Sequence, residues 1–193
     1  MSLYDLIIQR RTIRRFRQQP IAQEDLVDIV NAGRLAPSAS NLQPLEFLVV
    51  QDRELAKFVF DHTKWAGYLP PEQGRPGPEQ APVAHILILV NKKIRPDGGG
   101  LDVGAAAENM ILTALERGIG SCWIGSIIER PVLKERFHVP EHFELDSLLA
   151  LGYPDEEPVV EPLLESVKYY KDEQGRLHVP KRTLDSVLHI NKY

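Results

Sequence analysis

The pattern of apolar and polar positions predicts a chain in which helices and strands follow one another. Apolar residues recur at helical spacing near the N-terminus, where Ser2 is placed to cap a short helix, and again over residues 23–36 and 103–118. The pattern therefore predicts a folded domain that contains both kinds of element. Continuous apolar runs predict strands at residues 46–51, 84–90 and 145–151 and just beyond residue 118, and shorter helices are expected at residues 53–60 and 131–137.

The helix over residues 103–118 has the most regular pattern in the chain. Its apolar face is broad and rich in small side chains, which permit another backbone to approach closely. Such a helix lies at the centre of a domain or at a subunit interface. We therefore interpret Glu108 and Asn109 as interface or supporting groups rather than as catalysts.

A stiff loop, the proline loop (residues 35–44), joins the second helix to the first strand. Pro37 is expected to end the helix, because proline lacks an N–H group and disfavours helical geometry in the residue before it. Taken alone, the loop fits an ordinary solvated turn, since serine, asparagine and proline favour turns for local reasons. The alternative is a loop whose side-chain amides and hydroxyls reach outward to a ligand.

Two further segments lack a long regular pattern. Proline and glycine are so dense over residues 61–81 that long elements are excluded there, and Trp65 and Tyr68 are expected to be exposed. A lid over a site and a merely mobile excursion explain this segment equally well. Residues 155–193 are expected to form an extended arm rather than a second domain, with a short helical pattern near its end.

Composition and charge limit the class of protein. The 193 residues are 43% hydrophobic and 26% charged, which is typical of a single globular domain spanning residues 1–193. A net charge of −4 argues against a nucleic-acid partner. No apolar run approaches the roughly 20 residues that cross a bilayer, and the arginine-rich start lacks a signal-peptide core. A cytoplasmic protein without membrane contacts is therefore expected.

Two separate groups of basic residues are candidates for binding an anion. A solvated charged face is the ordinary interpretation of an arginine run, but planar guanidinium groups also grip phosphate through paired hydrogen bonds. A small phosphorylated ligand suits an acidic protein better than nucleic acid does. Lys181 and Arg182 form the second group, and spacing alone does not bring it to the first. The first group consists of Arg10, Arg11, Arg14, Arg15 and Arg17.

Neither the cysteine nor the histidines suggest a reactive centre. Cys122 is the only cysteine, so an intramolecular disulfide is excluded, and a small buried core residue is expected. His138 and His142 have a spacing that could bind a metal, but Pro140 disrupts the helix that this spacing requires, so no metal site is expected. The other histidines are isolated and are interpreted as structural.

Five stretches together resemble the nitroreductase-like flavoproteins. Residues 10–14, the arginine segment (Arg-Arg-Thr-Ile-Arg), resemble that family's N-terminal Arg-Arg-Ser-x-Arg motif. Residues 36–44 (Ala-Pro-Ser-Ala-Ser-Asn-Leu-Gln-Pro) are similar to its Pro-Ser-x-x-Asn-x-Gln-Pro loop. Residues 102–110 and 120–125 resemble its central helix and the following strand, and residues 180–182 its C-terminal phosphate-binding signature. The five occur in the family's order from about residue 8 to about residue 188.

The resemblance implies an α+β fold with a mixed, mainly antiparallel sheet flanked by helices, in an intertwined homodimer with two FMN molecules at its interface. It assigns phosphate and ribityl contacts to Arg10, Arg11, Thr12, Lys181 and Arg182. It places Arg14 near the pyrimidine edge of the flavin. It assigns contacts with the partner subunit's FMN to Pro37, Ser38, Ala39 and Asn41. It assigns backbone contacts with the isoalloxazine ring to Ile124 and Gly125.

The implied activity is a ping-pong NAD(P)H oxidoreductase. Hydride from NAD(P)H would pass through flavin N5 to a nitroaromatic, a quinone or a similar small electrophile. The redox chemistry belongs to the cofactor, so no acid–base pair need be visible in the sequence. Two alternatives are a relative of the same fold that fragments flavin or removes halogen, and a flavin-binding protein without enzymatic activity.

Several positions depart from the family pattern. Leu45 stands where an aromatic residue often follows Gln-Pro, and Lys181 and Arg182 are adjacent where many relatives separate their two basic residues. Residues 61–81 match no part of the pattern and are expected to shape the pocket for the acceptor.

Overall fold

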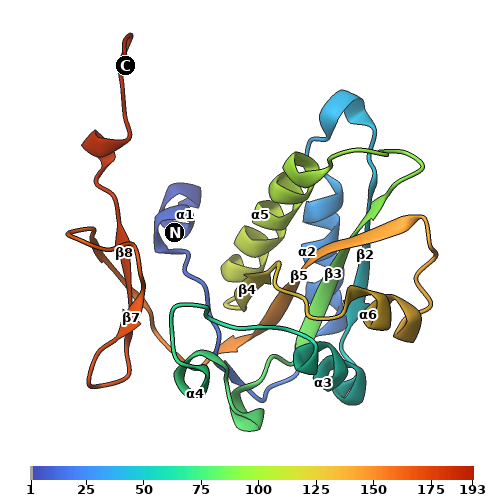
Figure 1. Ribbon diagram of the computed structural model, residues 1–193, viewed down its shortest axis with the longest axis horizontal. Helices are drawn as coiled ribbons and strands as arrows, with labels where there is room; N and C mark the ends of the chain where they lie inside the picture. Colours follow the sequence, from blue (N-terminus) through green and yellow to red (C-terminus); the bar gives the residue numbers. More distant parts are fainter. Residues whose placement is uncertain (1) are drawn as a thin grey trace.

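An antiparallel sheet forms the centre of the structure, a computed structural model that describes residues 2–193 (Figure 1). Four strands lie in the order β1-β5-β3-β2, and β4 also pairs with β5. β5 is the longest strand, which lets it pair with β3, β4 and β1 at once. The strands are β1 (Phe16–Arg17), β2 (Leu45–Val50), β3 (Ala84–Asn91), β4 (Gly120–Ile124) and β5 (Phe143–Pro154).

Helices cover both faces of this sheet. Residues of α2 and α5 form one apolar cluster with the sheet, and residues of α3 and α6 form a second on the other face. Side chains alternate along β3, so that Ile86 and Ile88 enter the first cluster while Leu87 and Leu89 enter the second. The helices are α1 (Leu3–Gln9), α2 (Gln23–Arg34), α3 (Arg53–Asp61), α4 (Pro71–Gly74), α5 (Gly100–Glu116) and α6 (Arg130–Arg136).

The predicted α+β class with a mainly antiparallel sheet is confirmed. Every strand pair of the central sheet is antiparallel, and parallel pairing occurs beside it, at the bridge between Thr12 and Ser121. The predicted cap is also present, because the Ser2 hydroxyl accepts the Asp5 N–H while the Asp5 carboxylate accepts the Ser2 N–H. The expected exposure of Trp65 was wrong. Its ring is half-buried against the second cluster, 5.5 Å from the ring of Phe60.

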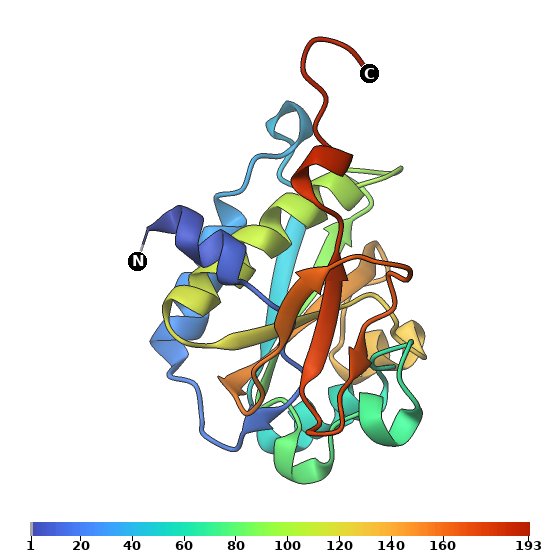
Figure 2. The ribbon, with the colours of Figure 1, turned by 90° about the vertical axis from the view of Figure 1, so that its left-hand side faces the viewer.

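The C-terminal arm (residues 155–193) contains a second, small sheet that the sequence pattern did not predict. Its strands β6 (Val159–Pro162), β7 (Tyr170–Lys171) and β8 (Leu177–Lys181) lie in the order β6-β8-β7. They are too short and too polar to give a clear two-residue alternation. The arm lies on the left of Figure 1, and Figure 2 shows its strands in front of the central sheet.

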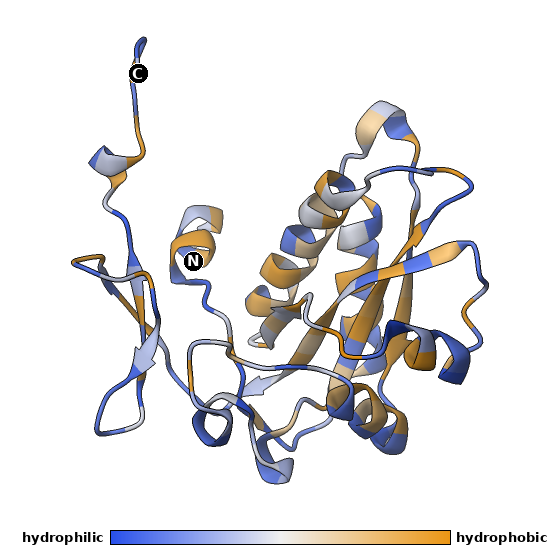
Figure 3. Ribbon diagram, in the orientation of Figure 1, coloured by the Kyte–Doolittle hydropathy of each residue, from blue (hydrophilic) through white to orange (hydrophobic). Residues whose placement is uncertain are grey.

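Hydropathy follows the division between core and arm. Figure 3 shows apolar residues concentrated in the central strands and in α5, and mainly polar residues in the arm. None of the helices within residues 2–193 has the length and apolarity that a membrane crossing needs.

Candidate functional site

The arginine segment lies directly beside β4. The Ile13 N–H donates to the Ser121 carbonyl oxygen at 2.9 Å, and Thr12 forms a parallel bridge with Ser121. Gly120 permits this approach, because a Cβ atom there would lie only 2.9 Å from Ile13 Cγ1. The fold therefore brings together residues 10–14 and 120–125, two stretches that the resemblance assigns to one ligand.

The side chains of the arginine segment are only partly neutralised. Arg10 pairs with Glu108 of α5 at 3.5 Å, whereas no ion pair among residues 2–193 includes Arg11 or Arg14. Arg11 is partly buried, and its burial, followed by the charge of Arg10, lowers its pKa. Burying guanidinium groups without a carboxylate makes the segment receptive to an anion.

Glu156 holds the backbone of the arginine segment in place. Its Oε1 accepts the Arg14 N–H at 2.5 Å and the Arg15 N–H at 3.2 Å, and its Oε2 lies 3.5 Å from Arg15 Nη1. The Glu156 side chain is only 11% exposed. Its role was not predicted, because Glu156 stands in a run of acidic residues that is typical of a solvated surface.

The arm places different residues near Arg14 from those expected. The Arg14 guanidinium lies 5.0 Å from the centre of the Tyr169 ring, a cation–π contact. Burial lowers the pKa of Lys171, and the charges of Arg15 and Arg14 lower it further. Arg15, Glu156 and Lys171 also line a pocket of about 700 Å³ between the arm and the rest of the chain.

Lys181 and Arg182 do not join the arginine segment within one chain. Lys181 is exposed at the end of β8. The Arg182 guanidinium donates to the Ser186 hydroxyl at 3.2 Å and to the Ser186 carbonyl oxygen. Within residues 2–193, neither residue has a hydrogen bond or an ion pair with residues 10–14.

The proline loop lies at the amino end of α5, where it contacts Asp102. The Ala39 N–H donates to Asp102 Oδ1 at 2.9 Å, and the Ser38 hydroxyl accepts the Gln43 N–H at 3.0 Å. Three of the loop residues are exposed, and Ser38 is partly buried. The exposed residues are Pro37, Ala39 and Asn41. A small pocket of about 150 Å³ lies beneath the loop and is lined in part by Asp102. No pattern in the chain predicted that Asp102 would be buried here.

Ile124 and Gly125 form the end of β4 and the start of the following loop. Ile124 is buried, and Gly125 is exposed with open space where a Cβ atom would stand. The Gly125 carbonyl oxygen accepts a hydrogen bond from Arg130 Nη2 at 2.7 Å. Trp123, beside them, is 43% exposed and donates its indole N–H to Ser147 Oγ at 2.9 Å.

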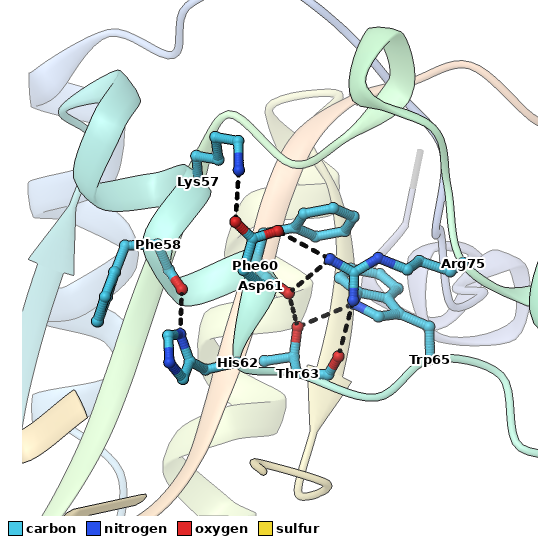
Figure 4. Close-up of polar contacts among 8 residues, drawn as sticks. All are labelled: Lys57, Phe58, Phe60, Asp61, His62, Thr63, Trp65 and Arg75. Atoms are coloured by element: carbon cyan, nitrogen blue, oxygen red, sulfur yellow. Dashed lines mark hydrogen bonds and ion pairs between the residues drawn. The ribbon is translucent and has the colours of Figure 1, made fainter. Parts of the chain in front are cut away.

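The 61–81 segment is tied to α3 by Arg75, as Figure 4 shows. The Arg75 guanidinium donates to the carbonyl oxygens of Thr63 and Phe60 at 3.2 and 3.3 Å, and it lies 3.1 Å from Asp61 Oδ1. It also covers the Phe60 ring, 4.0 Å from its centre. The Trp65 indole N–H donates to Thr63 Oγ1 at 2.9 Å.

The same segment reaches the arginine segment through two tyrosines. The Tyr68 and Tyr169 rings lie 5.0 Å apart, and Tyr169 is the ring that lies against Arg14. Tyr68 is 54% exposed. This contact places the tip of the 61–81 segment next to the candidate site.

Cys122 is a buried core residue, as expected. Burial raises the pKa of its thiol to about 11. Because only the thiolate is a strong nucleophile, Cys122 stays unreactive near neutral pH. Cys122 thus adds no nucleophile to the candidate site. The groups that the site does offer are cations, aromatic rings and backbone groups, which suit the binding of a flat anionic molecule.

Comparison with known proteins identifies the family. A sequence model of the Nitroreductase family matches residues 7–153. The chain is similar to a protein of Archaeoglobus fulgidus named "Putative NADH dehydrogenase/NAD(P)H nitroreductase", with 34% identity over 158 residues, which cover 79% of this chain and 85% of that protein. The chain belongs to the Nitroreductase family, and the predicted resemblance is confirmed.

Two further relatives differ in the activities that their names state. An iodotyrosine deiodinase of Thermotoga neapolitana is 28% identical over 184 residues, which cover 87% of this chain and 97% of that protein. The solved structure of an NADPH:FMN oxidoreductase from Vibrio harveyi complexed with NAD+ aligns with a TM-score of 0.69 and 25% identity, over 99% of this chain and 77% of that one.

Proposed function

We propose that the protein is an FMN-dependent NAD(P)H oxidoreductase that passes hydride to nitroaromatic, quinone or similar small electrophilic acceptors. One observation carries the proposal. The arginine segment lies against Ser121 of β4, the strand that leads to residues 124 and 125, so cationic side chains and this backbone would contribute to one site. The names of the Archaeoglobus and Vibrio relatives support the same activity.

The residues of this site fit FMN. Arg11 and Arg14 lack a carboxylate partner within residues 2–193, and a phosphate or an anionic ring edge would supply the missing charge. The open space at Gly125 leaves room for a flat ring beside the backbone. We assign the phosphate and ribityl contacts to Arg10, Arg11 and Thr12, and the ring contacts to Ile124 and Gly125.

FMN, when bound, supplies hydride transfer at N5 between the nicotinamide donor and the acceptor. Arg14 would provide a positive charge near the pyrimidine edge, which would stabilise negative charge on the reduced flavin. Glu156 holds the Arg14 backbone, and the Tyr169 ring lies against the guanidinium. Donor and acceptor would occupy the same site in turn, which would make the kinetics ping-pong.

We also propose that the complete site requires a second copy of the chain in a homodimer. Pro37, Ser38, Ala39 and Asn41 lie at the amino end of α5, and they would contact the FMN held mainly by the partner. Lys181 and Arg182 lie in the arm, and they would reach the phosphate in the assembled dimer. Exposed apolar side chains on α1 and in the last ten residues support a subunit interface.

A dehalogenating activity is a second candidate, which rests on the iodotyrosine deiodinase relative, whose length the chain matches almost completely. A flavin-fragmenting activity and a flavin-binding role without turnover are tested beside it. Turnover with NADH separates the binding role from the enzymes, since a binder without activity consumes no nucleotide. Parallel assays with a nitroaromatic, a quinone and a halogenated phenol distinguish the acceptor classes.

The decisive experiment is an absorption spectrum of freshly purified protein, followed by anaerobic addition of NADH and then NADPH. We expect a yellow protein whose flavin bands bleach with at least one nucleotide. Flavin bands that neither nucleotide bleaches would favour a binding protein. A colourless protein that also fails to take up added FMN would contradict the proposal.

A further inference from the structure

Asp102 is a buried carboxylate that the proposed function leaves without a role. It lies in the first turn of α5, and its side chain is 4% exposed. Oδ1 accepts the Ala39 N–H at 2.9 Å. Within residues 2–193, Oδ2 has no hydrogen-bond partner, and the nearby Arg95 Nε, 4.0 Å away, has none either. A buried carboxylate is costly, so a chain that keeps one gains something from its position.

The proline loop above Asp102 has a backbone conformation that needs support. Ser40, Asn41 and Gln43 have φ values of 53°, 54° and 51°. These values lie in the left-handed region, which residues other than glycine seldom adopt. Such residues persist only where the surrounding structure holds them, and they cluster where ligands are bound. This loop is largely exposed, so packing does not hold it.

Hydrogen bonds hold the loop instead. Inside the loop, the Ser38 hydroxyl accepts the Gln43 N–H at 3.0 Å, and the Ser38 carbonyl oxygen accepts the Asn41 N–H at 2.9 Å. From outside, Asp102 is the residue within the described chain that bonds to residues 37–43. The contact joins the loop to α5, the helix at the centre of the first apolar cluster.

We infer that Asp102 is a positioning residue that fixes the proline loop in the conformation that binds flavin. The inference rests on the proposed function for its ligand, but the loop contact itself does not. Oδ1 acts as the hydrogen-bond acceptor for Ala39, and the Arg95 guanidinium offsets the buried charge. Without Asp102, the exposed loop loses its hydrogen bond to α5. The backbone that presents Ser38, Ala39 and Asn41 is then no longer held in a single conformation.

The test compares Asp102→Ala with Asp102→Asn, which keeps an acceptor oxygen of the same reach. Hydrogen exchange of peptides covering residues 37–43 reports the loop, and titration of apoprotein with FMN reports binding. We expect Asp102→Ala to speed exchange at the Ala39 amide and to weaken FMN binding, each by about tenfold, as suits loss of a hydrogen bond to a charged group. Asp102→Asn should stay within about threefold of the wild type in both. Glu116→Ala, at the other end of α5, is the matched control.

Each outcome bears on the inference. Wild-type exchange and FMN affinity in Asp102→Ala would overturn it, and so would a loss of FMN affinity without faster loop exchange. If Asp102→Ala fails to fold, Asp102→Asn decides, because loosening of its loop would overturn the acceptor role. A wild-type protein that binds no FMN would refute the proposed function, while the exchange comparison would still decide the role of Asp102.

Discussion

At the scale of single residues, two largely buried carboxylates hold backbone groups of the candidate site. Glu156 binds the backbone of Arg14 and Arg15, and Asp102 binds the backbone of Ala39. Both acids act on main-chain N–H groups, so the side chains of Arg14 and Ala39 are not used in these contacts. Charge-assisted hydrogen bonds of this kind are about twice as strong as neutral ones.

Arg14→Ala should slow reduction of bound flavin by NAD(P)H more than it lowers stability. The guanidinium is partly buried, has no ion-pair partner within residues 2–193, and contacts the Tyr169 ring. Loss of one fixed charge should reduce the anaerobic reduction rate by at least about tenfold. Arg14→Lys, which keeps the charge, should lose less. Unchanged reduction kinetics in Arg14→Ala would remove Arg14 from the mechanism.

His178 should make the small sheet of the arm sensitive to pH. Its Nδ1 lies 2.9 Å from Glu161 and its Nε2 3.0 Å from Asp172, and the Tyr170 ring stacks on it at 4.9 Å. The hydrogen bonds with Asp172 and then Glu161 raise the pKa of His178 above its usual 6.5. The raised pKa adds stability that is complete below about pH 6.5 and is lost as pH rises through the folded-state value.

Amide exchange in β8 between about pH 6 and pH 9 measures this effect, after correction for the intrinsic pH dependence of exchange. We expect protection to fall with rising pH in the wild type and to depend less on pH in His178→Gln. An NMR titration that gives His178 an ordinary pKa would contradict the prediction.

The site residues that sequence could predict are those that stand in motifs. Arg14 and Ala39 occupy such positions, whereas Asp102, Glu156 and Tyr169 act through contacts between segments far apart in the chain. A buried acid and a surface acid look alike in one sequence, because burial depends on the tertiary fold. The family and its cofactor were therefore predictable from sequence, whereas the contacts that hold the arginine segment and the proline loop were not.

At the scale of elements, apolar periodicity predicted the central strands and helices well. β3 and α5 have strong patterns because both are deeply buried, and their predicted bounds lie within a few residues of Ala84–Asn91 and Gly100–Glu116. The three strands of the arm carry no comparable signal, since β7 has two residues and β6 is half-exposed. Arg75 ties the 61–81 segment to α3, and its Tyr68 ring lies against Tyr169 beside the arginine segment, so the choice between a lid and a mobile excursion stays a prediction.

Gly120→Ala should disturb the contact between the arginine segment and β4. The new Cβ would lie 2.9 Å from Ile13 Cγ1 and 3.0 Å from Pro154 Cγ, so the segment would have to move. We expect the free energy of unfolding to fall by about 1–3 kcal/mol, as for other overpacked sites, together with weaker FMN binding.

Urea unfolding and FMN titration of the same preparation measure both effects. Gly77→Ala is the matched control, because nothing lies within 4 Å of its added Cβ and its φ is −71°. If Gly120→Ala matched this control in both measurements, the close approach would not constrain the site.

At the scale of the whole molecule, the single chain leaves apolar surface that a second copy could cover. α1 has no buried residue, and its apolar side chains Ile7 and Ile8 are 45% and 48% exposed. Leu188 and Ile190 near the C-terminus are likewise 50% and 74% exposed. Large apolar patches on a folded chain commonly mark interaction sites. The proposed site also needs the proline loop and the arm to reach FMN from a neighbouring copy.

The wild type should therefore sediment as a dimer, and Ile7→Glu combined with Leu188→Glu should shift it toward monomer. Each substitution removes hydrophobic contacts from the interface. It also buries a carboxylate, whose desolvation destabilises the dimer further. Dissociation should also weaken FMN binding, since residues 37–41 would no longer meet the partner's flavin. Ile94→Glu, at a 42% exposed position outside α1 and the arm, is the control. A wild-type monomer that binds FMN tightly would show that one chain completes the site, and the assignment of the proline loop to the partner's flavin would then be wrong.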